Sequence, residues 1–175
     1  MKQIALFGGS FDPPHIGHLA VADAALRQLD IEKLVIVPAY LNPFKSRSHA
    51  PASLRLQWLR EIFGEEPRVE VSDFEIAMGR PVPTIETVRH FREQAEKIYL
   101  IIGADNLASL EQWYAYEALD ALVTWVVARR GGIDVPDRFL TLETDMPVSS
   151  TQLRQQIERH VLPAAVADAI TAHYR

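Results

Sequence analysis

The chain has 175 residues, of which 48% are hydrophobic and 23% are charged, so it can bury one substantial core and disorder is disfavoured. Its formal net charge of −5 argues against a general nucleic-acid binder, and a cysteine count of 0 excludes a disulfide framework or a thiolate metal site. The opening Met1-Lys2-Gln3 has no signal-peptide pattern, and no apolar run reaches the length of a membrane span. We therefore expect a cytoplasmic protein with no nucleic-acid or membrane partner.

Apolar strand-like runs alternate with helical periodicity from the beginning of the chain to its end. We predict strands at residues 4–7, 34–38, 69–72, 98–102 and 122–128. We predict helices at residues 19–29, 53–63, 84–95, 107–117, 150–160 and 163–173, and a loop at residues 39–52. Continuous apolar strands separated by helices are typical of a parallel sheet covered on both faces. The sequence therefore predicts an α/β fold, a doubly wound parallel sheet, as a single domain over residues 1–175.

A run rich in glycine, proline and histidine joins the first strand to the first helix: Gly8-Gly9-Ser10-Phe11-Asp12-Pro13-Pro14-His15-Ile16-Gly17-His18. We expect Gly8 and Gly9 to form a sharp turn that lets the backbone approach a ligand. A helix N-terminus favours an anion, and His15 and His18 lie one helical turn apart there. The order fits neither a P-loop nor the dinucleotide-binding glycine pattern. We interpret this run as a site for a nucleotide triphosphate.

Polar runs also follow later strands, where the ligands of a doubly wound sheet lie. They are Asn42-Pro43-Phe44-Lys45, Gly103-Ala104-Asp105-Asn106 and Arg129-Arg130-Gly131. A further run, Ser149-Ser150-Thr151-Gln152-Leu153-Arg154, opens a predicted helix. Its hydroxyls could serve only as helix caps, but the Arg154 guanidinium one turn later can hold phosphate oxygens in a fork. We predict a second phosphate site at this run.

His15-Ile16-Gly17-His18 resembles the H-x-G-H element of a nucleotidyltransferase superfamily, and the run that ends at Arg154 resembles its second motif. The resemblance implies a Rossmann-like nucleotidyltransferase fold. It also implies a reaction in which an acceptor phosphate attacks the α-phosphorus of ATP in line and pyrophosphate leaves, driven by positioning and electrostatics. It assigns His15 and His18 as catalytic, with His18 the more direct stabiliser of the transition state. Mg²⁺ would enter with ATP and bridge its phosphates, and no residue is assigned as a metal ligand.

The ATP site implied by this resemblance draws on both ends of the chain and its middle. Asp105 would touch the ribose or the water shell of the metal, whereas Asp12 is expected to form a turn rather than bind metal. The assigned residues are Gly8, Gly9, Ser10, Phe11, His15, His18, Gly103, Asp105, Ser149, Ser150, Thr151 and Arg154.

Three further features resemble the bacterial nicotinate-mononucleotide adenylyltransferases in particular. They are residues 101–107 followed by Trp113-Tyr114, Pro83-Thr84 with Thr87, and residues 126–131. By this resemblance Trp113 stacks on the pyridine ring, backbone N–H groups hold the nicotinate carboxylate, and Lys45 and Arg129 contact phosphates. The implied acceptor-binding residues are Lys45, Thr84, Trp113, Tyr114 and Arg129. The implied reaction adenylylates nicotinate mononucleotide in NAD biosynthesis.

Several alternatives stay open at the level of sequence. One alternative enzyme is a phosphopantetheine adenylyltransferase, because that family shares the first motif. One alternative acceptor is nicotinamide mononucleotide, which differs from nicotinate mononucleotide by a single charge. A third alternative is a nucleotide-binding module without turnover, which would be marked by loss of a catalytic histidine or of Arg154. Trp113 and Tyr114 could be core aromatics, and Lys45 could be a solvated charge. Pro83, Ala39 and Phe44 stand where the family commonly has other residues, which affects the acceptor contacts more than the ATP site. The sequence is compatible with a homo-oligomer.

Overall fold

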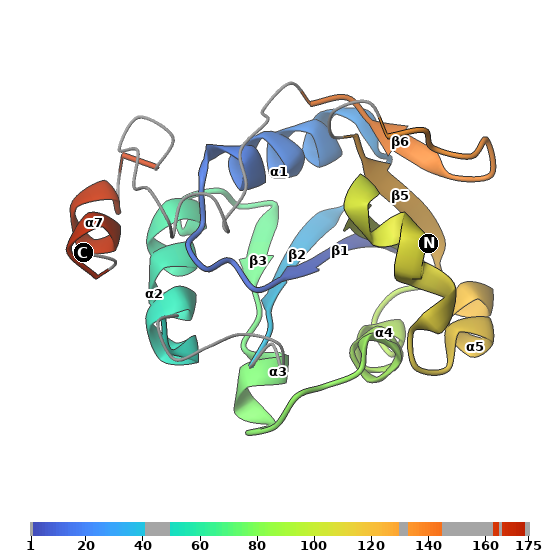
Figure 1. The fold of residues 1–175 in the computed structure, drawn as a ribbon, viewed down its shortest axis with the longest axis horizontal. Coiled ribbons are helices and arrows are strands. Elements are labelled where there is room, and N and C mark those ends of the chain that lie inside the picture. Colours follow the sequence, from blue (N-terminus) through green and yellow to red (C-terminus); the bar gives the residue numbers. More distant parts are fainter. Residues whose placement is uncertain (1, 41–49, 130–132, 145–162, 165, 174–175) are drawn as a thin grey trace.

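The computed structural model describes residues 2–40, 50–129, 133–144, 163–164 and 166–173, and its centre is one parallel sheet (Figure 1). The sheet has six strands in the order β3-β2-β1-β4-β5-β6, and each neighbouring pair is parallel. The strands are β1 (Gln3–Gly9), β2 (Lys33–Pro38), β3 (Val69–Val71), β4 (Lys97–Gly103), β5 (Thr124–Ala128) and β6 (Leu140–Leu142). The prediction of a doubly wound parallel sheet is confirmed.

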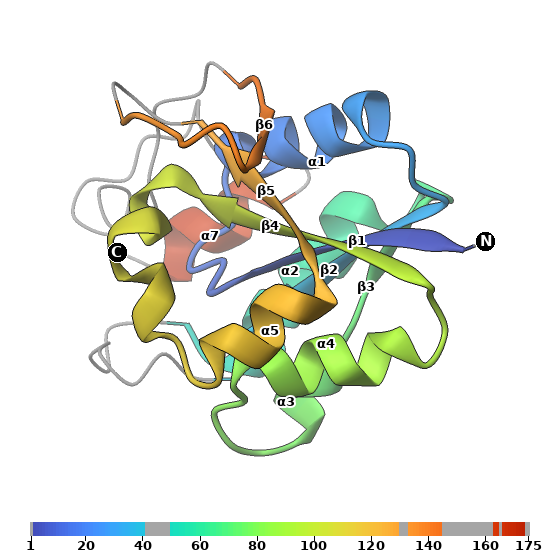
Figure 2. The same cartoon turned by 90° about the vertical axis from the view of Figure 1, so that its right-hand side faces the viewer.

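Helices cover both faces of the sheet (Figure 2). They are α1 (Ile16–Gln28), α2 (Ala52–Phe63), α3 (Phe74–Ala77), α4 (Thr84–Arg92), the 3-10 helix η1 (Ala104–Gln112), α5 (Tyr116–Leu122) and α7 (Ala167–His173). Side chains alternate along β1, so Ile4 and Leu6 pack beneath α4, η1 and α5, while Ala5 and Phe7 pack beneath α1 and α2. Burial on both faces explains why the strands are continuous apolar runs.

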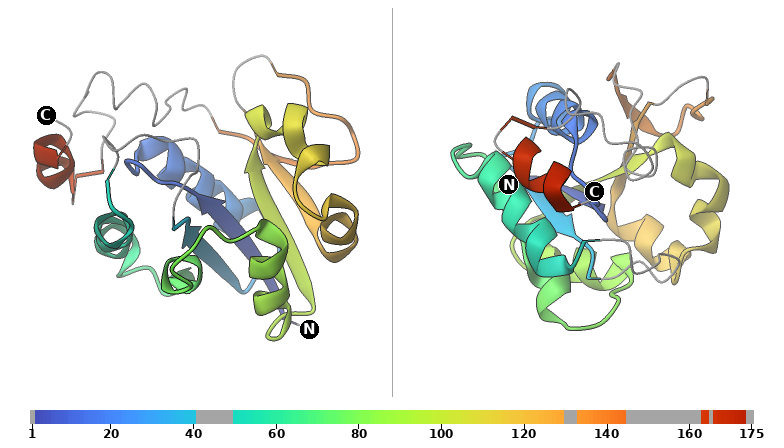
Figure 3. Two further views of the ribbon diagram at one scale, coloured as in Figure 1. Left: turned by 60° about the horizontal axis from the view of Figure 1, so that its bottom comes forward. Right: turned by 60° about the vertical axis from the view of Figure 1, so that its left-hand side comes forward.

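The C-terminal helix α7 lies beside α2 at the edge of the molecule far from β6 (Figure 3). Trp58 of α2 is only 1% exposed and forms a separate small core with Val166, Ala167 and Ile170. The ring of Trp58 also meets the ring of His173 edge-on, with centroids 5.7 Å apart. This packing attaches α7 to the outer surface of α2.

Several predicted elements differ from the observed ones. Helix α1 begins at Ile16 rather than at residue 19, because His15 already adopts the extended backbone of an N-cap. The helix predicted at residues 107–117 is confirmed only in part: residues 107–112 belong to the 3-10 helix η1, but η1 ends before Trp113, and Ala115 takes a left-handed φ of 53° before α5 begins. Helix α3 and strand β6, with four and three residues, were not predicted because they are too short to show a period. The predicted helix at 150–160 lies outside the described residues.

The sheet opens between β1 and β4 at their carboxyl ends. The two strands pair from Gln3 to Phe7, but Gly8 and Gly9 pair only with β2, and Gly103 pairs only with β5. Strand order reverses at this same point, which is where ligands of doubly wound sheets bind. No helix in the described part of the chain has the length and apolar character needed to cross a bilayer.

Candidate active site

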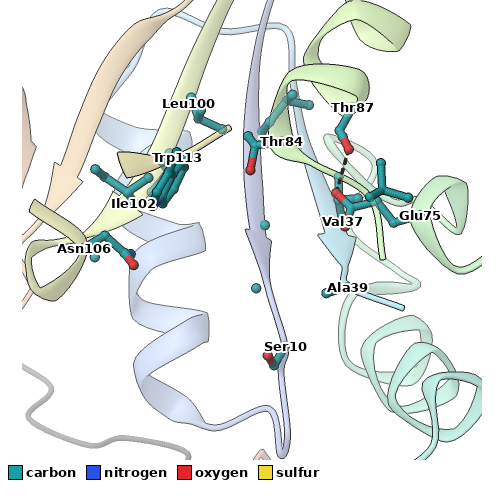
Figure 4. A pocket seen from close by; sticks show the side chains of 16 residues that line it. Ser10, Val37, Ala39, Glu75, Thr84, Thr87, Leu100, Ile102, Asn106 and Trp113 are labelled. Carbon is teal, nitrogen blue, oxygen red and sulfur yellow. Dashed lines mark hydrogen bonds between the residues drawn. The ribbon is translucent and has the colours of Figure 1, made fainter. Parts of the chain in front are cut away.

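A pocket of about 290 Å³ lies where the sheet opens, at the carboxyl ends of β1, β2 and β4 (Figure 4). It brings together residues assigned from three separate sequence runs: Gly8, Gly9, Ser10, Thr84, Gly103 and Trp113. It is also lined by Glu75, Thr87 and Asn106, with Val37 and Ala39 from the end of β2. The pocket therefore has an apolar floor formed by strands and a polar rim formed by the segments that follow them.

The two glycines at the end of β1 form one wall of this pocket. The prediction of a turn at Gly8 and Gly9 is wrong, because both continue the strand, and the left-handed φ of 51° comes later, at Phe11. A Cβ at Gly8 would approach nothing closer than 3.8 Å, at the Val37 carbonyl. Since the fold itself would accept a side chain there, the glycine keeps space open in the pocket rather than relieving strain.

His15 and His18 lie together at the start of α1. Their rings stack with centroids 3.8 Å apart and an interplanar angle of 19°. The backbone N–H of His15 donates to Nδ1 of His18 over 3.0 Å, so the proton of the neutral His18 imidazole resides on Nε2. His15 is fully buried and His18 is partly exposed. The helix start thus fixes the orientation of both rings.

Phe11 supports this histidine pair from the interior. It is 2% exposed, its ring meets Phe7 edge-on at 5.3 Å, and its centroid lies 4.7 Å from that of His18. Its left-handed backbone turns the chain from β1 toward α1. Phe11 therefore packs against His18 and Phe7, and its ring also lies beside Gly9, where a Cβ would come within 3.5 Å of it.

Arg55 of α2 joins the segments that follow β1 and β2. Its guanidinium donates to four backbone carbonyls: Ser10 at 2.7 Å, Ala39 at 2.8 Å, Tyr40 at 3.0 Å and Ala50 at 3.0 Å. The side chain is buried, with 5% of the residue exposed. Sequence analysis missed this residue. The available signal was its position three and four residues before the buried Trp58 and Leu59, on the apolar face of α2.

Asp12 reinforces the same junction. Its carboxylate Oδ1 accepts a hydrogen bond from the Ala50 backbone N–H over 3.0 Å, and the residue is 2% exposed. The side chain therefore connects the run after β1 to the residues that precede α2. A buried carboxylate that accepts a backbone N–H fits the expected structural role better than that of a metal ligand.

The start of α4 supplies the opposite side of the pocket. Thr84 is the first residue of α4, and Thr87, one turn later, donates its hydroxyl to Oε2 of Glu75 over 2.6 Å. Burial raises the pKa of Glu75 to about 7, and the Thr87 hydrogen bond opposes that rise. Sequence analysis missed Glu75, because α3 has only four residues and no recognisable motif.

Trp113 lies at the other end of the pocket, at the C-terminal end of η1. Its ring packs edge-on against Trp125, with centroids 6.1 Å apart, so one edge is held by the core while the residue stays partly exposed. Tyr114 follows directly but is 72% exposed and is not among the described residues that line the pocket. The alternative of two core aromatics is wrong for Tyr114.

Asp105 and Arg129, two further assigned residues, are not among the described residues that line this pocket. Asp105 is exposed in the first turn of η1, and a Cβ at Gly103 would come within 2.5 Å of its Oδ1. Arg129 is exposed after β5 and pairs with Glu143 over 3.2 Å. The described residues include no group of three His, Cys, Asp or Glu side chains placed to hold a metal ion. Lys45, Ser149, Ser150, Thr151 and Arg154 lie outside the described residues.

The chain matches known proteins along nearly its whole length. A family model described as cytidylyltransferase-like matches residues 6–156. A Sulfurimonas denitrificans protein named "Probable nicotinate-nucleotide adenylyltransferase" is 56% identical over 175 residues, covering 100% of this chain and 96% of that protein. A Campylobacter jejuni protein with the same name is 42% identical over 174 residues, covering 98% of this chain and 96% of its own.

Solved structures agree on the fold. The Plasmodium falciparum nicotinic acid mononucleotide adenylyltransferase complexed with NaAD superposes with a TM-score of 0.80 at 18% identity, covering 99% of this chain and 96% of that one. The same enzyme complexed with APC gives a TM-score of 0.76 at 17% identity, with the same coverage. At such identities the likeness concerns the arrangement of strands and helices.

Proposed function

The chain belongs to the nicotinate-nucleotide adenylyltransferases, a family of nucleotidyltransferase enzymes, and from this premise we propose how its residues transfer the adenylyl group of ATP. The acceptor is nicotinate mononucleotide, and the products are nicotinate adenine dinucleotide and pyrophosphate. The observation that carries the proposal is the pocket where β1 and β4 separate, lined by Gly8, Gly103 and Trp113, together with the histidine pair at the start of α1, which follows β1 and is not among the described lining residues. We also propose that residues 1–175 act as one nucleotidyltransferase domain.

ATP is proposed to lie over the carboxyl ends of β1 and β4, with its α-phosphate at the start of α1. Gly8 and Gly9 leave the backbone accessible there, and Ser10 adds a hydroxyl at the pocket wall. Asp105, exposed just after β4, is suited to contact the ribose or the water shell of a metal. Ser149, Ser150, Thr151 and Arg154 are proposed to take the leaving pyrophosphate, on the strength of their motif.

The acceptor is proposed to occupy the pocket between Trp113 and the start of α4. The partly exposed Trp113 ring offers an aromatic face to a pyridine ring, and Thr84 offers the first N–H groups of a helix. Lys45 and Arg129 remain proposals as phosphate contacts, as does Tyr114 as an acceptor contact. Exposure of Tyr114 places any such contact at the rim.

Mg²⁺ is proposed to arrive with ATP. This ion usually keeps several waters and binds mainly through substrate phosphates, with few protein ligands. When bound, Mg²⁺ neutralises phosphate charge. The residues of the chain then position the reactants: His18 donates from Nε2 to the α-phosphate as negative charge grows, and α1 adds its N-terminal dipole. The acceptor phosphate attacks in line, and no covalent enzyme intermediate is required.

Pyrophosphate release with three acceptors in parallel tests the proposed function. With ATP and Mg²⁺, we expect strong preference for nicotinate mononucleotide over nicotinamide mononucleotide and phosphopantetheine. If the enzyme prefers nicotinamide mononucleotide, the proposed mechanism stands but the proposed acceptor is wrong. Turnover with phosphopantetheine alone would move the chain to the alternative branch, and binding of nucleotides without any turnover would favour a binding module.

The role of Trp113 gives a prediction of its own. Stacking on an aromatic side chain contributes about 1–3 kcal/mol per base, so Trp113→Leu is expected to raise the KM for the acceptor by about 10–100-fold. The KM for ATP should change far less. Trp113→Phe keeps an aromatic face and should recover most of the loss. Steady-state kinetics with each substrate varied in turn measure the effect, and equal losses for both substrates would contradict it.

A further inference from the structure

The Glu75 carboxyl is an unexpected acidic group in a pocket proposed to receive an anion. Figure 4 shows Glu75 and Thr87 at one side of the pocket and Trp113 with Asn106 at the other, with Thr84 between them. Thr87 satisfies Oε2 of Glu75 over 2.6 Å, while Oε1 has no hydrogen-bond partner among the described residues. A ligand between Trp113 and Thr84 would therefore share the pocket with this carboxyl.

In the described part of the chain, no cationic side chain forms an ion pair with the Glu75 carboxylate. The charged and titratable side chains around it are Asp73 at the N-cap of α3, Arg80 after α3, Glu86, Arg89, His90 and Arg92 on α4, and Arg55 on α2, which contacts the pocket wall at Ser10 and Ala39. Arg80 pairs with Glu86 over 3.0 Å, and the His90 ring stacks on Phe74 at 4.1 Å. Val37 of β2, a strand that packs against α3, and Ala39, which follows β2, line the pocket and carry no charge. The pKa of Glu75, at about 7, is set by burial first and by Thr87 second.

We propose that Glu75 is a specificity-determining residue that admits the anionic acceptor only in its protonated form, so that acceptor binding takes up one proton at this carboxyl. The inference rests on the proposed function, which places a mononucleotide bearing a carboxylate and a phosphate in this pocket. An ionised Glu75 would repel either group, because like charges in a partly desolvated pocket disfavour one another. Protonated at Oε1, the same carboxyl becomes a hydrogen-bond donor that can face an anionic oxygen.

Because acceptor binding is coupled to protonation of Glu75, acceptor affinity should decrease as the pH rises. Below pH 7 Glu75 is largely neutral, so binding of the acceptor needs no extra protonation. Above its pKa of about 7, the ionised form dominates, and acceptor affinity should fall by about tenfold per pH unit. The acceptor phosphate itself titrates near pH 6. That titration is common to all variants, so only differences between their profiles report on Glu75.

The test measures acceptor affinity and proton uptake by calorimetry between pH 6 and 8.5, in two buffers of different ionisation enthalpy. The parent protein should take up a proton at pH 8 and lose affinity as the pH rises. Glu75→Gln, a neutral group of the same shape, should remove the uptake and flatten the profile. Glu86→Gln makes the same change outside the pocket and should leave the parent profile intact. A Glu75→Gln profile that parallels the parent would overturn the proposal.

A second variant keeps the test decisive if Glu75→Gln fails to fold. Thr87→Val removes the hydrogen bond that lowers the pKa of Glu75, so the fall in affinity should begin at a higher pH than in the parent. An unchanged midpoint would overturn the proposal. Turnover of nicotinate mononucleotide is measured in the same preparations. Its absence at every pH would refute the proposed function, whereas normal turnover with parallel profiles refutes only the role of Glu75.

Discussion

Replacing His18 with alanine is expected to lower kcat by at least two to three powers of ten, with little change in the KM of either substrate. Removal of one donor aimed at developing charge usually costs about 100–1,000-fold. The effect should fall on kcat because the charge on the α-phosphate grows only in the transition state. The geometry supports this assignment: Nδ1 of His18 is committed to the His15 N–H, and Phe11 and His15 hold the ring.

Two matched variants separate chemistry from folding in this experiment. His18→Asn keeps an acceptor near the position of Nδ1 and should preserve the helix start while still losing turnover. His90→Ala removes an exposed histidine from α4, outside the described lining of the pocket, and should retain parental kcat. Steady-state kinetics and far-UV circular dichroism on all three proteins provide the readouts. A kcat for His18→Ala within threefold of the parent would remove His18 from the mechanism.

Replacing Arg55 with methionine is expected to lower the free energy of unfolding by about 3–5 kcal/mol. The change removes four hydrogen bonds from a charged donor to buried or partly buried carbonyls, each worth about 1.5–3 kcal/mol, and relaxation of the loops recovers part of that loss. Methionine fills a similar volume, so the cost reports the polar contacts rather than a cavity. Urea unfolding measures the effect directly.

The same helix provides the control for Arg55. Arg60 is exposed in the last turn of α2, and Arg60→Met should change stability by no more than about 0.5 kcal/mol. Arg55→Lys should fall between parent and Arg55→Met, because one ammonium cannot match the fork that spans Ser10, Ala39 and Tyr40. Equal unfolding energies for Arg55→Met and Arg60→Met would show that this junction contributes nothing to stability.

His18 and Arg55 both lie near the carboxyl ends of the strands, but different kinds of contact hold them in place. His18 is held by its own helix start, through contacts between neighbours in sequence. Arg55 holds the ends of β1 and β2 together from a helix that follows both strands. The pocket wall at Ser10 depends on this second, long-range contact. Because Ser10 is proposed to line the ATP site, loss of Arg55 is expected to impair ATP binding even under conditions where the variant remains folded.

The sequence by itself determined the parts of this protein that local patterns encode. Continuous apolar runs predicted the strands at residues 34–38 and 98–102 because burial on both faces of a parallel sheet demands them. The histidines and glycines of the first motif predicted a nucleotide site from residues that are close in the chain. The boundary of α1 was misplaced by three residues, since the cap is set by the backbone of His15.

Only the tertiary structure decided which distant residues meet. It placed Trp113 in the pocket and Tyr114 at 72% exposure, a distinction that depends on the break between η1 and α5. It buried Arg55 against four carbonyls and brought Glu75 beside Thr87 in the pocket at the carboxyl ends of β1 and β4. The physical reason is that burial and hydrogen-bond partners arise only when segments distant in sequence pack together. The role of a charged side chain such as that of Arg55 therefore depends on residues that are not its neighbours in the sequence.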